Sequence, residues 1–276
     1  MVRSLFIFAI STFILSLLYF SGIATTATLE GRPTIFGMNQ NHLGIGICVS
    51  IFVILSVVFE NKLNLGKGRY NLLLMLPLLL VFMINTGSRV AFLSLVGGVF
   101  FFLYFRRAIS PFKKGMIISM SVIALLLFWQ FYLKNSFLAE RLSDTVNDGD
   151  LANRDLIWLE LFDVITSNVY FGIGRTGFAS LFGGASPHNV IIEVLCYTGV
   201  VGLFIFLIFI FRLIGTAYKR NKQNGELLPI VLVIPFLGIV LSGQILEQKY
   251  IWIVVAYILS SSQKVKEVTF KKTANV

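Results

Sequence analysis

The sequence predicts an all-α protein: a polytopic membrane helix bundle of about eight spans that carries one large, partly helical extracytoplasmic loop. Two observations predict this class. Apolar residues make up 57% of the 276 residues and charged residues only 13%, whereas soluble domains carry roughly 25% charged residues. The apolar residues also gather in uncharged runs, several of which approach the roughly 20 residues that a membrane-spanning helix needs.

Eight apolar runs follow one another along the chain, and we interpret each run as a span. They cover residues 5–22, 43–59, 70–85, 90–105, 115–133, 189–211, 227–243 and 250–262. Pro77 and Pro235 fall inside two runs, where neighbouring helices can compensate for a kink. The first run also fits a cleaved signal peptide, which would leave seven spans. We expect a single membrane domain, 1–276, with the large extracytoplasmic loop at 134–188 inside it.

The interior of the predicted spans lacks the residues of several functional classes. Only Glu193, near an outer end, places an ionisable side chain in a span. Pumps and ion-coupled carriers usually hold such groups at the membrane midplane, so the sequence argues against them. Cys48 and Cys196 lie in apolar runs, which indicates packing residues rather than a disulfide framework or a metal site.

Lysine and arginine predict the orientation, because they accumulate on the cytoplasmic side of membrane proteins. If Arg3 is cytoplasmic, 16 of the 23 lysines and arginines fall inside, and ten of the 13 acidic residues fall outside. We therefore expect a multi-pass protein of the inner membrane with both termini in the cytoplasm. A basic excess arranged in this way reflects membrane topology and predicts no nucleic-acid partner.

The polar side chains that could do chemistry gather at the predicted outer boundary. They come from the first outer loop, from a tight turn between the third and fourth spans, and from the large loop. In chain order they are Arg32, Arg89 (in Thr86-Gly87-Ser88-Arg89), Arg154, Arg175, and His188 with Asn189.

The order of these motifs resembles that of the O-antigen ligase and polymerase family, the Wzy-like and WaaL-like enzymes. An outer Gly-Arg…Asn loop precedes Thr-x-Ser-Arg, and a long loop with Asn153-Arg154-Asp155-Leu156-Ile157-Trp158 follows. Next come Phe171-Gly172-Ile173-Gly174 and then His188-Asn189, which leads into a span with Gly199-Val200-Val201-Gly202. The resemblance covers about residues 23–255, although members of the family usually have more spans.

The resemblance implies a membrane glycosyltransferase that transfers or polymerises glycan chains, as in O-antigen, capsule or exopolysaccharide assembly. The implied partners are an undecaprenyl-diphosphate-linked glycan donor, a glycan or lipid acceptor with a free hydroxyl, and the lipids of the bacterial inner membrane. The implied reaction lies on the outer side of that membrane and uses no metal and no cofactor. The implied catalytic residues are His188, Arg89 and Arg154, and the implied substrate-binding residues are Arg32, Arg175 and Asn189.

Elementary chemistry agrees with these roles. Arginine binds phosphate through a bidentate fork and stays charged at any relevant pH. Fixed cations can stabilise the charge that develops on a leaving diphosphate. A histidine can take the proton of an acceptor hydroxyl or orient that hydroxyl.

Each of these residues also has a plainer interpretation. Arg89 could extend to lipid headgroups, and His188 could be an ordinary loop residue. Arg154 begins a predicted helix at 154–167, which we expect to lie along the outer membrane surface. Its apolar face would be Ile157, Leu161, Val164 and Ile165, with Trp158 in the headgroup layer.

Two further patterns in the large loop are set aside. Residues 172–177 spell G-x-G-x-x-G but lack the strand–helix–strand context of a dinucleotide site, so we predict a glycine-rich turn. Asp144, Asp148 and Asp150 miss the spacing of a calcium loop, so we predict a solvated acidic loop.

Three functions from different classes compete at this point. A glycan ligase or polymerase predicts that the arginines and His188 converge on one outer cavity. A shortened, non-catalytic subunit of a polysaccharide assembly system predicts scattered arginines. A lipid-linked glycan flippase predicts a charged path through the bundle, which the predicted spans do not provide.

The predicted orientation can be tested by cysteine labelling from outside the membrane. A membrane-impermeant thiol reagent should label a cysteine placed at Ser180, in the large loop, and should spare one placed at Ser110, in a predicted cytoplasmic loop. The opposite pattern would place the arginines and His188 on the cytoplasmic side and overturn the topology.

Overall fold

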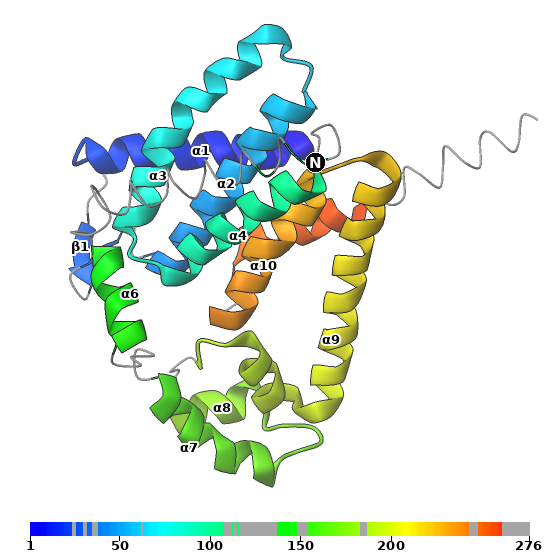
Figure 1. The fold of residues 1–276 in the computed structure, drawn as a ribbon. Coiled ribbons are helices and arrows are strands. Elements are labelled where there is room, and N and C mark those ends of the chain that lie inside the picture. The colour runs from blue at the N-terminus through cyan, green and yellow to red at the C-terminus, as the bar shows by residue number, and fades with distance from the viewer. Residues whose placement is uncertain are drawn as a thin grey trace, which may run out of the picture.

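The structure is a computed structural model, which describes residues 1–23, 26–29, 32–34, 38–61, 63–106, 112, 115, 137–147, 154–182, 187–242 and 248–260. Its elements are α1 (Val2–Phe20), β1 (Thr26–Leu29), β2 (Arg32–Thr34), α2 (Gln40–Glu60), η1 (Gly66–Met75), α3 (Leu76–Asn85), α4 (Arg89–Phe105), α6 (Phe137–Asn147), α7 (Arg154–Ser167), α8 (Gly174–Phe182), α9 (Val190–Asn224), α10 (Leu228–Ser242) and a last helix, Lys249–Ser260. In Figure 1, α7 and α8 lie together at the lower end of α9, below the other helices.

Four described helices are long and apolar enough to span a membrane: α1, α2, the continuous stretch of η1 and α3, and α9. Three shorter apolar helices, α4, α10 and Lys249–Ser260, coincide with three further predicted spans. The predicted span 115–133 lies outside the described residues apart from Gly115. These apolar helices indicate an integral membrane protein, and the count of eight spans stays a prediction.

Two local features differ from the predicted all-α bundle. Part of the first outer loop forms a two-stranded antiparallel hairpin, in which Leu29 of β1 pairs with Arg32 of β2. The predicted span 70–85 begins in a 3-10 helix and becomes α-helical at Leu76, so Pro77 lies inside the continuous helical stretch, in the first turn of its α-helical part. Proline fits this position, because a first-turn N–H has no acceptor within the helix.

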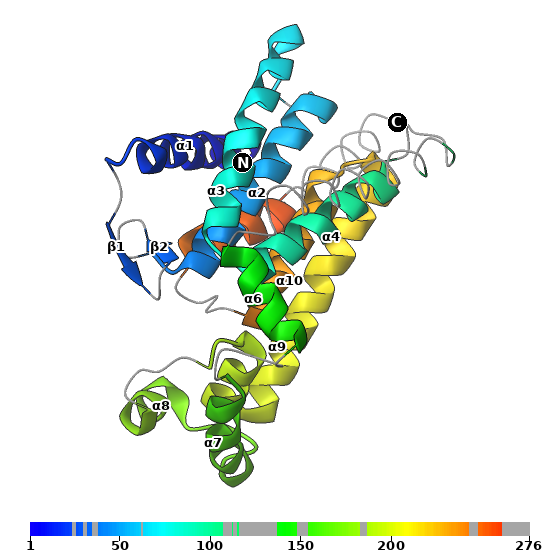
Figure 2. The same cartoon turned by 60° about the vertical axis from the view of Figure 1, so that its left-hand side comes forward.

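The central helix of the bundle is α2. Most of its side chains are buried, and α1, α3, α4 and α10 pack against it. α4 and α10 lie side by side in both views (Figures 1 and 2). Small residues permit the close contacts: a Cβ at Gly98 of α4 would lie 2.2 Å from the Phe52 ring, and one at Gly238 of α10 would lie 2.3 Å from the Ser94 hydroxyl. Small residues are how membrane helices approach one another closely.

A buried polar cluster joins four helices at the Glu60 end of α2. The Arg220 guanidinium, 3% exposed, pairs with Glu226 and donates to the Tyr257 carbonyl (3.2 Å). The Glu60 carboxylate accepts from the Leu227 N–H. A buried charge is stable only when it is paired and hydrogen-bonded, and Arg220 meets both conditions through Glu226 and the Tyr257 carbonyl. The lysine–arginine pattern assigns these three charged residues to one side of the membrane; which side that is stays a prediction.

α9 is longer than the span predicted there, and it is interrupted. The helix covers 35 residues, and Gly199 (φ 63°, ψ −165°) breaks it. The turn after α7 pairs with the backbone groups that the break frees. The Val200 N–H donates to the Val169 carbonyl (2.8 Å), and the Ile173 N–H donates to the Cys196 carbonyl (2.9 Å). Interrupted membrane helices are tolerated where protein satisfies the freed groups in this way.

Glycine is required at two positions of this junction. A Cβ at Gly199 would lie 2.2 Å from the Tyr170 carbonyl carbon, and a Cβ at Gly172 would lie 2.4 Å from the Cys196 carbonyl oxygen. Both glycines also have positive φ, 63° and 66°, which costs other residues roughly 1–2 kcal/mol. The predicted turn at 172–177 is wrong for residues 174–177, which form the start of α8; only Gly172 and Ile173 precede the helix, and the close approach of the α9 backbone explains Gly172.

We expect Gly199→Ala to loosen the contact between α9 and the turn after α7. The added methyl group clashes with the Tyr170 carbonyl and strains the backbone, so the free energy of unfolding should fall by more than about 2 kcal/mol. Thermal unfolding in detergent measures the loss. The control is Gly215→Ala on the same helix, where a Cβ meets nothing within 4 Å and alanine favours the helix. Equal stability of the two variants would contradict this account of the break.

Candidate functional site

The segment Pro187–Asn189, which leads into α9, is held from both sides. The Trp158 indole of α7 donates from Nε1 to the Pro187 carbonyl (2.9 Å). The Asn189 side chain caps α9, because its Oδ1 accepts from the Ile191 N–H (2.9 Å). His188 between these anchors has φ 50°, a conformation that few residues other than glycine adopt and that histidine adopts more often than most. The predicted His-Asn pair is therefore a fixed corner, and a contact of Asn189 with substrate stays a prediction.

The predicted helix at 154–167 is confirmed with the same bounds, but its apolar face meets protein. Leu161 is fully buried in a cluster with Phe178 of α8 and Cys196 of α9, and Ile157 and Ile165 pack against that cluster. The expectation that this face rests on the membrane is therefore wrong, since periodicity alone does not distinguish a protein-facing from a lipid-facing stripe. Trp158 donates to Pro187, and its place in the headgroup layer stays a prediction.

Arg89 is the first residue of α4 and follows a tight turn, as predicted. The Ser88 hydroxyl caps the helix by accepting from the Ala91 N–H (3.3 Å), and the Thr86 hydroxyl accepts from the Ser88 N–H (3.3 Å). Gly87 has φ 61°, which turns the chain between α3 and α4. The guanidinium of Arg89 therefore belongs to a helix N-terminus, where the helix dipole adds positive potential for an anion.

This turn packs directly on the first turns of α2. A Cβ at Gly44 would lie 2.7 Å from the Ala91 Cβ and 3.1 Å from the Ser88 Cβ. The backbone of α2 thus approaches the turn more closely than a side chain would permit, which places the start of α2 beside the backbone of Arg89.

The start of α2 also carries the second of the two histidines in the sequence. His42 is 6% exposed, and its carbonyl accepts from the Tyr250 hydroxyl of the last helix (2.8 Å). The His42 and His188 imidazoles interact electrostatically. Two histidines that are far apart in the sequence are therefore close enough for their charges to interact, and the Arg89 turn packs two residues further along α2.

Arg175 lies in the first turn of α8 and is exposed. Its charge acts on the Tyr197 hydroxyl of α9, which also hydrogen-bonds the Glu193 carboxylate. Glu193 lies in the first turn of α9 and is 6% exposed. A carboxylate at a helix N-terminus is favourable. Arg175 therefore lies where α8 packs against the first part of α9, which runs from the residues after His188 to the break at Gly199.

For two predicted site residues, the structure describes the position of the backbone but not that of the side chain. Arg154 is the first residue of α7, one turn before Trp158, and Arg32 is the first residue of β2. Their side chains lie outside what the structure describes, so their roles stay predictions. Asp148 and Asp150 also lie outside it, and within the described residues no three histidine, cysteine or acidic side chains gather as metal ligands.

His42 is not among the residues that the sequence singles out. A signal was available, because His42 ends a polar stretch from Asn39 that directly precedes the predicted span 43–59, on the predicted outer side. Its proximity to His188 could not be inferred, because this depends on where the fold places the start of α2 relative to the start of α9.

Comparison with known protein families gives one match. The profile of a family described as O-Antigen ligase matches residues 72–207. The matched segment begins in η1 and ends in α9, so it contains Arg89, α7, α8 and His188, whereas His42 lies before it. Among the curated proteins compared with the chain, none matches.

We expect Trp158→Phe to loosen the His188 corner without removing the aromatic packing of α7. Phenylalanine lacks the indole N–H, so the Pro187 carbonyl loses a hydrogen bond worth about 1 kcal/mol. Hydrogen–deuterium exchange over residues 187–192 should then rise several-fold. The control is Trp252→Phe on the last helix, where the tryptophan is 39% exposed. Unchanged exchange in Trp158→Phe would mean that the corner does not depend on this bond.

Proposed function

Residues 72–207 belong to the O-antigen ligase domain family, and from this premise we propose that the chain transfers or polymerises glycan chains from an undecaprenyl-diphosphate donor. The acceptor is a hydroxyl of a glycan or lipid on the outer side of the inner membrane. Two observations support the proposal: the Arg89 turn packs on the first turns of α2, where His42 lies, and His42 is close enough to His188 for their charges to interact. A cation for phosphate next to a proton acceptor is what transfer from a lipid diphosphate requires.

The Arg89 turn supplies the site for the diphosphate. The guanidinium can bind two phosphate oxygens at once, and the N-terminus of α4 adds the partial positive charge of its backbone N–H groups. Arg175, on the His188 side of the break in α9, and Arg154, at the start of α7, are the further cations that we assign to the donor.

His188 acts on the acceptor. The acceptor oxygen bonds to the anomeric carbon of the donor sugar while the bond from that carbon to the diphosphate oxygen breaks. The acceptor proton passes to the His188 imidazole, and the released diphosphate keeps the bonding electron pair as charge that the arginines stabilise. The imidazole accepts this proton in its neutral form, which is the ordinary form of histidine at or above neutral pH.

The distribution of buried charge favours this reaction over a flippase. The buried charged side chains of the described helices include Glu193, in the first turn of α9, and Arg220, in the polar cluster near its other end. Charges at the ends of the bundle suit chemistry at one face, whereas passage of a lipid-linked glycan needs polar groups along the whole path.

The mechanism predicts different defects for the arginine and the histidine. Arg89→Lys keeps the charge but loses the fork, so donor binding should weaken about tenfold. His188→Ala should bind donor almost as well as the wild type and should transfer glycan on the order of 10²–10⁴ times more slowly, because its role is proton transfer. Glycan transfer from a purified lipid-linked donor, with donor binding measured in parallel, reads out both effects.

The matched control is Arg106→Lys, because Arg106 lies over the Phe59 ring at the other end of α2 (4.5 Å to the centroid) and should not affect transfer. A chelator should also change little. Full transfer by both Arg89→Lys and His188→Ala would support a non-catalytic assembly subunit instead. Loss of transfer with a chelator, restored by a divalent cation, would direct attention to Asp144, Asp148 and Asp150.

A further inference from the structure

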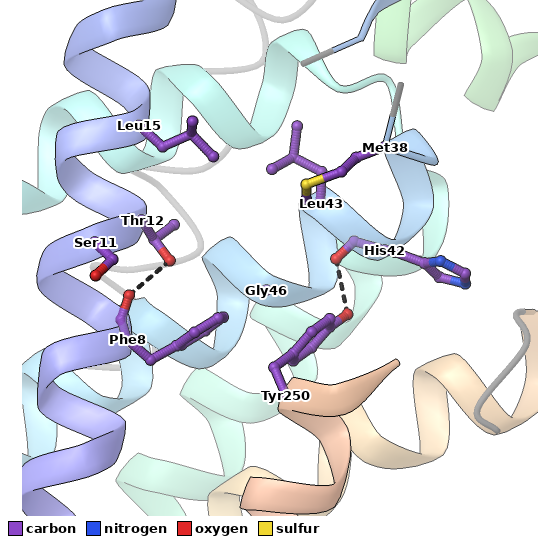
Figure 3. Close-up of a pocket in the computed structure, with 9 residues that line it drawn as sticks. All are labelled: Phe8, Ser11, Thr12, Leu15, Met38, His42, Leu43, Gly46 and Tyr250. Carbon is purple, nitrogen blue, oxygen red and sulfur yellow. Dashed lines mark hydrogen bonds between the residues drawn. The ribbon is translucent and has the colours of Figure 1, made fainter. Parts of the chain in front are cut away.

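A pocket of about 320 Å³ opens between α1, the start of α2 and the last helix. Figure 3 shows the side chains that form it. The principal walls are Phe8, Thr12 and Leu15 from α1, Leu43 and Gly46 from α2, and Tyr250 from the last helix. The Phe8 and Tyr250 rings stack with their centroids 5.4 Å apart, next to the bare backbone of Gly46.

The main polar atoms of this pocket are already hydrogen-bonded to the protein. The Thr12 hydroxyl donates to the Phe8 carbonyl (2.9 Å), and the Tyr250 hydroxyl donates to the His42 carbonyl (2.8 Å). A polar ligand placed there would lose hydration and gain few hydrogen bonds in return, which is costly. A hydrocarbon ligand loses nothing of that kind, so the lining selects a hydrocarbon chain.

The pocket borders the lipid of the bilayer. α1 is one of the helices that are long and apolar enough to span a membrane, and its outward side chains Ile7, Ile14 and Leu17 are 65%, 50% and 47% exposed. Large apolar side chains that are exposed on a membrane helix face lipid. A hydrocarbon chain can therefore reach the pocket from the membrane without crossing water.

The first turns of α2 separate this pocket from the polar site. The His42 carbonyl faces Tyr250 at the pocket, and its imidazole points away from the Phe8 and Tyr250 rings (Figure 3). That imidazole interacts with His188. On the same stretch of α2, Gly44 contacts the Arg89 turn and Gly46 contacts the pocket rings. One short segment of helix thus has an anion site on one side and a hydrocarbon site on the other.

We propose that this pocket binds the isoprenoid units next to the diphosphate of the polyprenyl donor, while the Arg89 turn holds the diphosphate itself. The inference rests on the proposed function for its choice of lipid. A membrane phospholipid would fill a hydrocarbon pocket equally well, but a pocket beside a diphosphate site receives the chain that is covalently joined to that diphosphate. The pocket therefore selects the lipid carrier, and the glycan plays no part in its binding.

The test uses the full chain in phosphatidylethanolamine–phosphatidylglycerol vesicles and a polyprenyl diphosphate without glycan. The probe carries a photoreactive diazirine on its first isoprenoid units, and the labelled peptides are identified by mass spectrometry. We expect labelling within residues 8–15 and 38–46. An excess of unlabelled polyprenyl diphosphate should remove this labelling, and the same excess of phosphatidylglycerol should not.

Gly46→Leu is the decisive variant, because Gly46 lines the pocket and a leucine side chain there takes up space that the ligand needs. Displacing several buried methylene groups should weaken labelling on the order of tenfold or more. Gly215→Leu adds the same side chain where a Cβ meets nothing within 4 Å, and it should label like the wild type. Gly46→Ala places its Cβ in ordinary contact, 3.5 Å from Phe8, so it should fold and label to an intermediate extent even if Gly46→Leu does not fold.

The possible results separate this inference from the proposed function. Equal labelling by a diazirine phospholipid, or undiminished labelling of folded Gly46→Leu and Gly46→Ala, would overturn the assignment of the pocket even if the chain transfers glycan. If polyprenyl diphosphate labels the pocket specifically and Gly46→Leu abolishes that labelling, the pocket assignment is supported, whether or not the chain transfers glycan. If glycan transfer is then absent, only the proposed transferase activity is contradicted.

Discussion

The interruption of α9 at Gly199, and its pairing with the turn after α7, is the constraint on which the outer half of the molecule depends. Backbone N–H and carbonyl groups freed inside an apolar helix must find partners, because lipid offers none. Val169 and Ile173 supply those partners to Val200 and Cys196, so the turn must sit against α9. Since α7 and α8 flank this turn, they dock as well, and Leu161 becomes buried against α9. The docked α7 then places its indole on the Pro187 carbonyl. The position of His188 follows from a break in a helix eleven residues further along the chain.

The second organising element is α2, whose two ends carry different chemistry. One end carries Glu60, which belongs to the buried cluster of Arg220 and Glu226 and joins α2 to α9, α10 and the last helix. The other end carries His42 beside the Arg89 turn. The apolar side chains between them contribute more residues to the bundle core than those of any other described helix. The charge cluster joins α2 to the end of α9 and the start of α10, and at the other end of α2 the charges of His42 and His188 interact.

A transferase for lipid-linked glycans has to bind a charged diphosphate and a hydrocarbon chain that are covalently joined. Water-exposed sites suit the first and lipid-exposed sites suit the second, so the two must adjoin across a thin partition. In the function that we propose, the first two turns of α2 are this partition. Gly44 lets the Arg89 turn approach on one side, and Gly46 leaves room for a hydrocarbon on the other. Glycine at both positions makes the partition as thin as a helix backbone permits.

The sequence by itself determined what depends on neighbours along the chain. The apolar runs indicated membrane helices, the Thr86–Arg89 turn and the glycine at 172 follow from local residue types, and the bounds of α7 follow from its periodicity.

The tertiary structure decided what depends on residues far apart. It showed that the apolar face of α7 meets α8 and α9 rather than lipid, that Gly199 interrupts α9, and that His42 lies beside His188. The physical reason is that hydrophobic periodicity and capping report the surroundings of a residue within a turn or two of helix. Which apolar face meets protein, and which histidine meets another, is settled only when helices that are distant in sequence pack together.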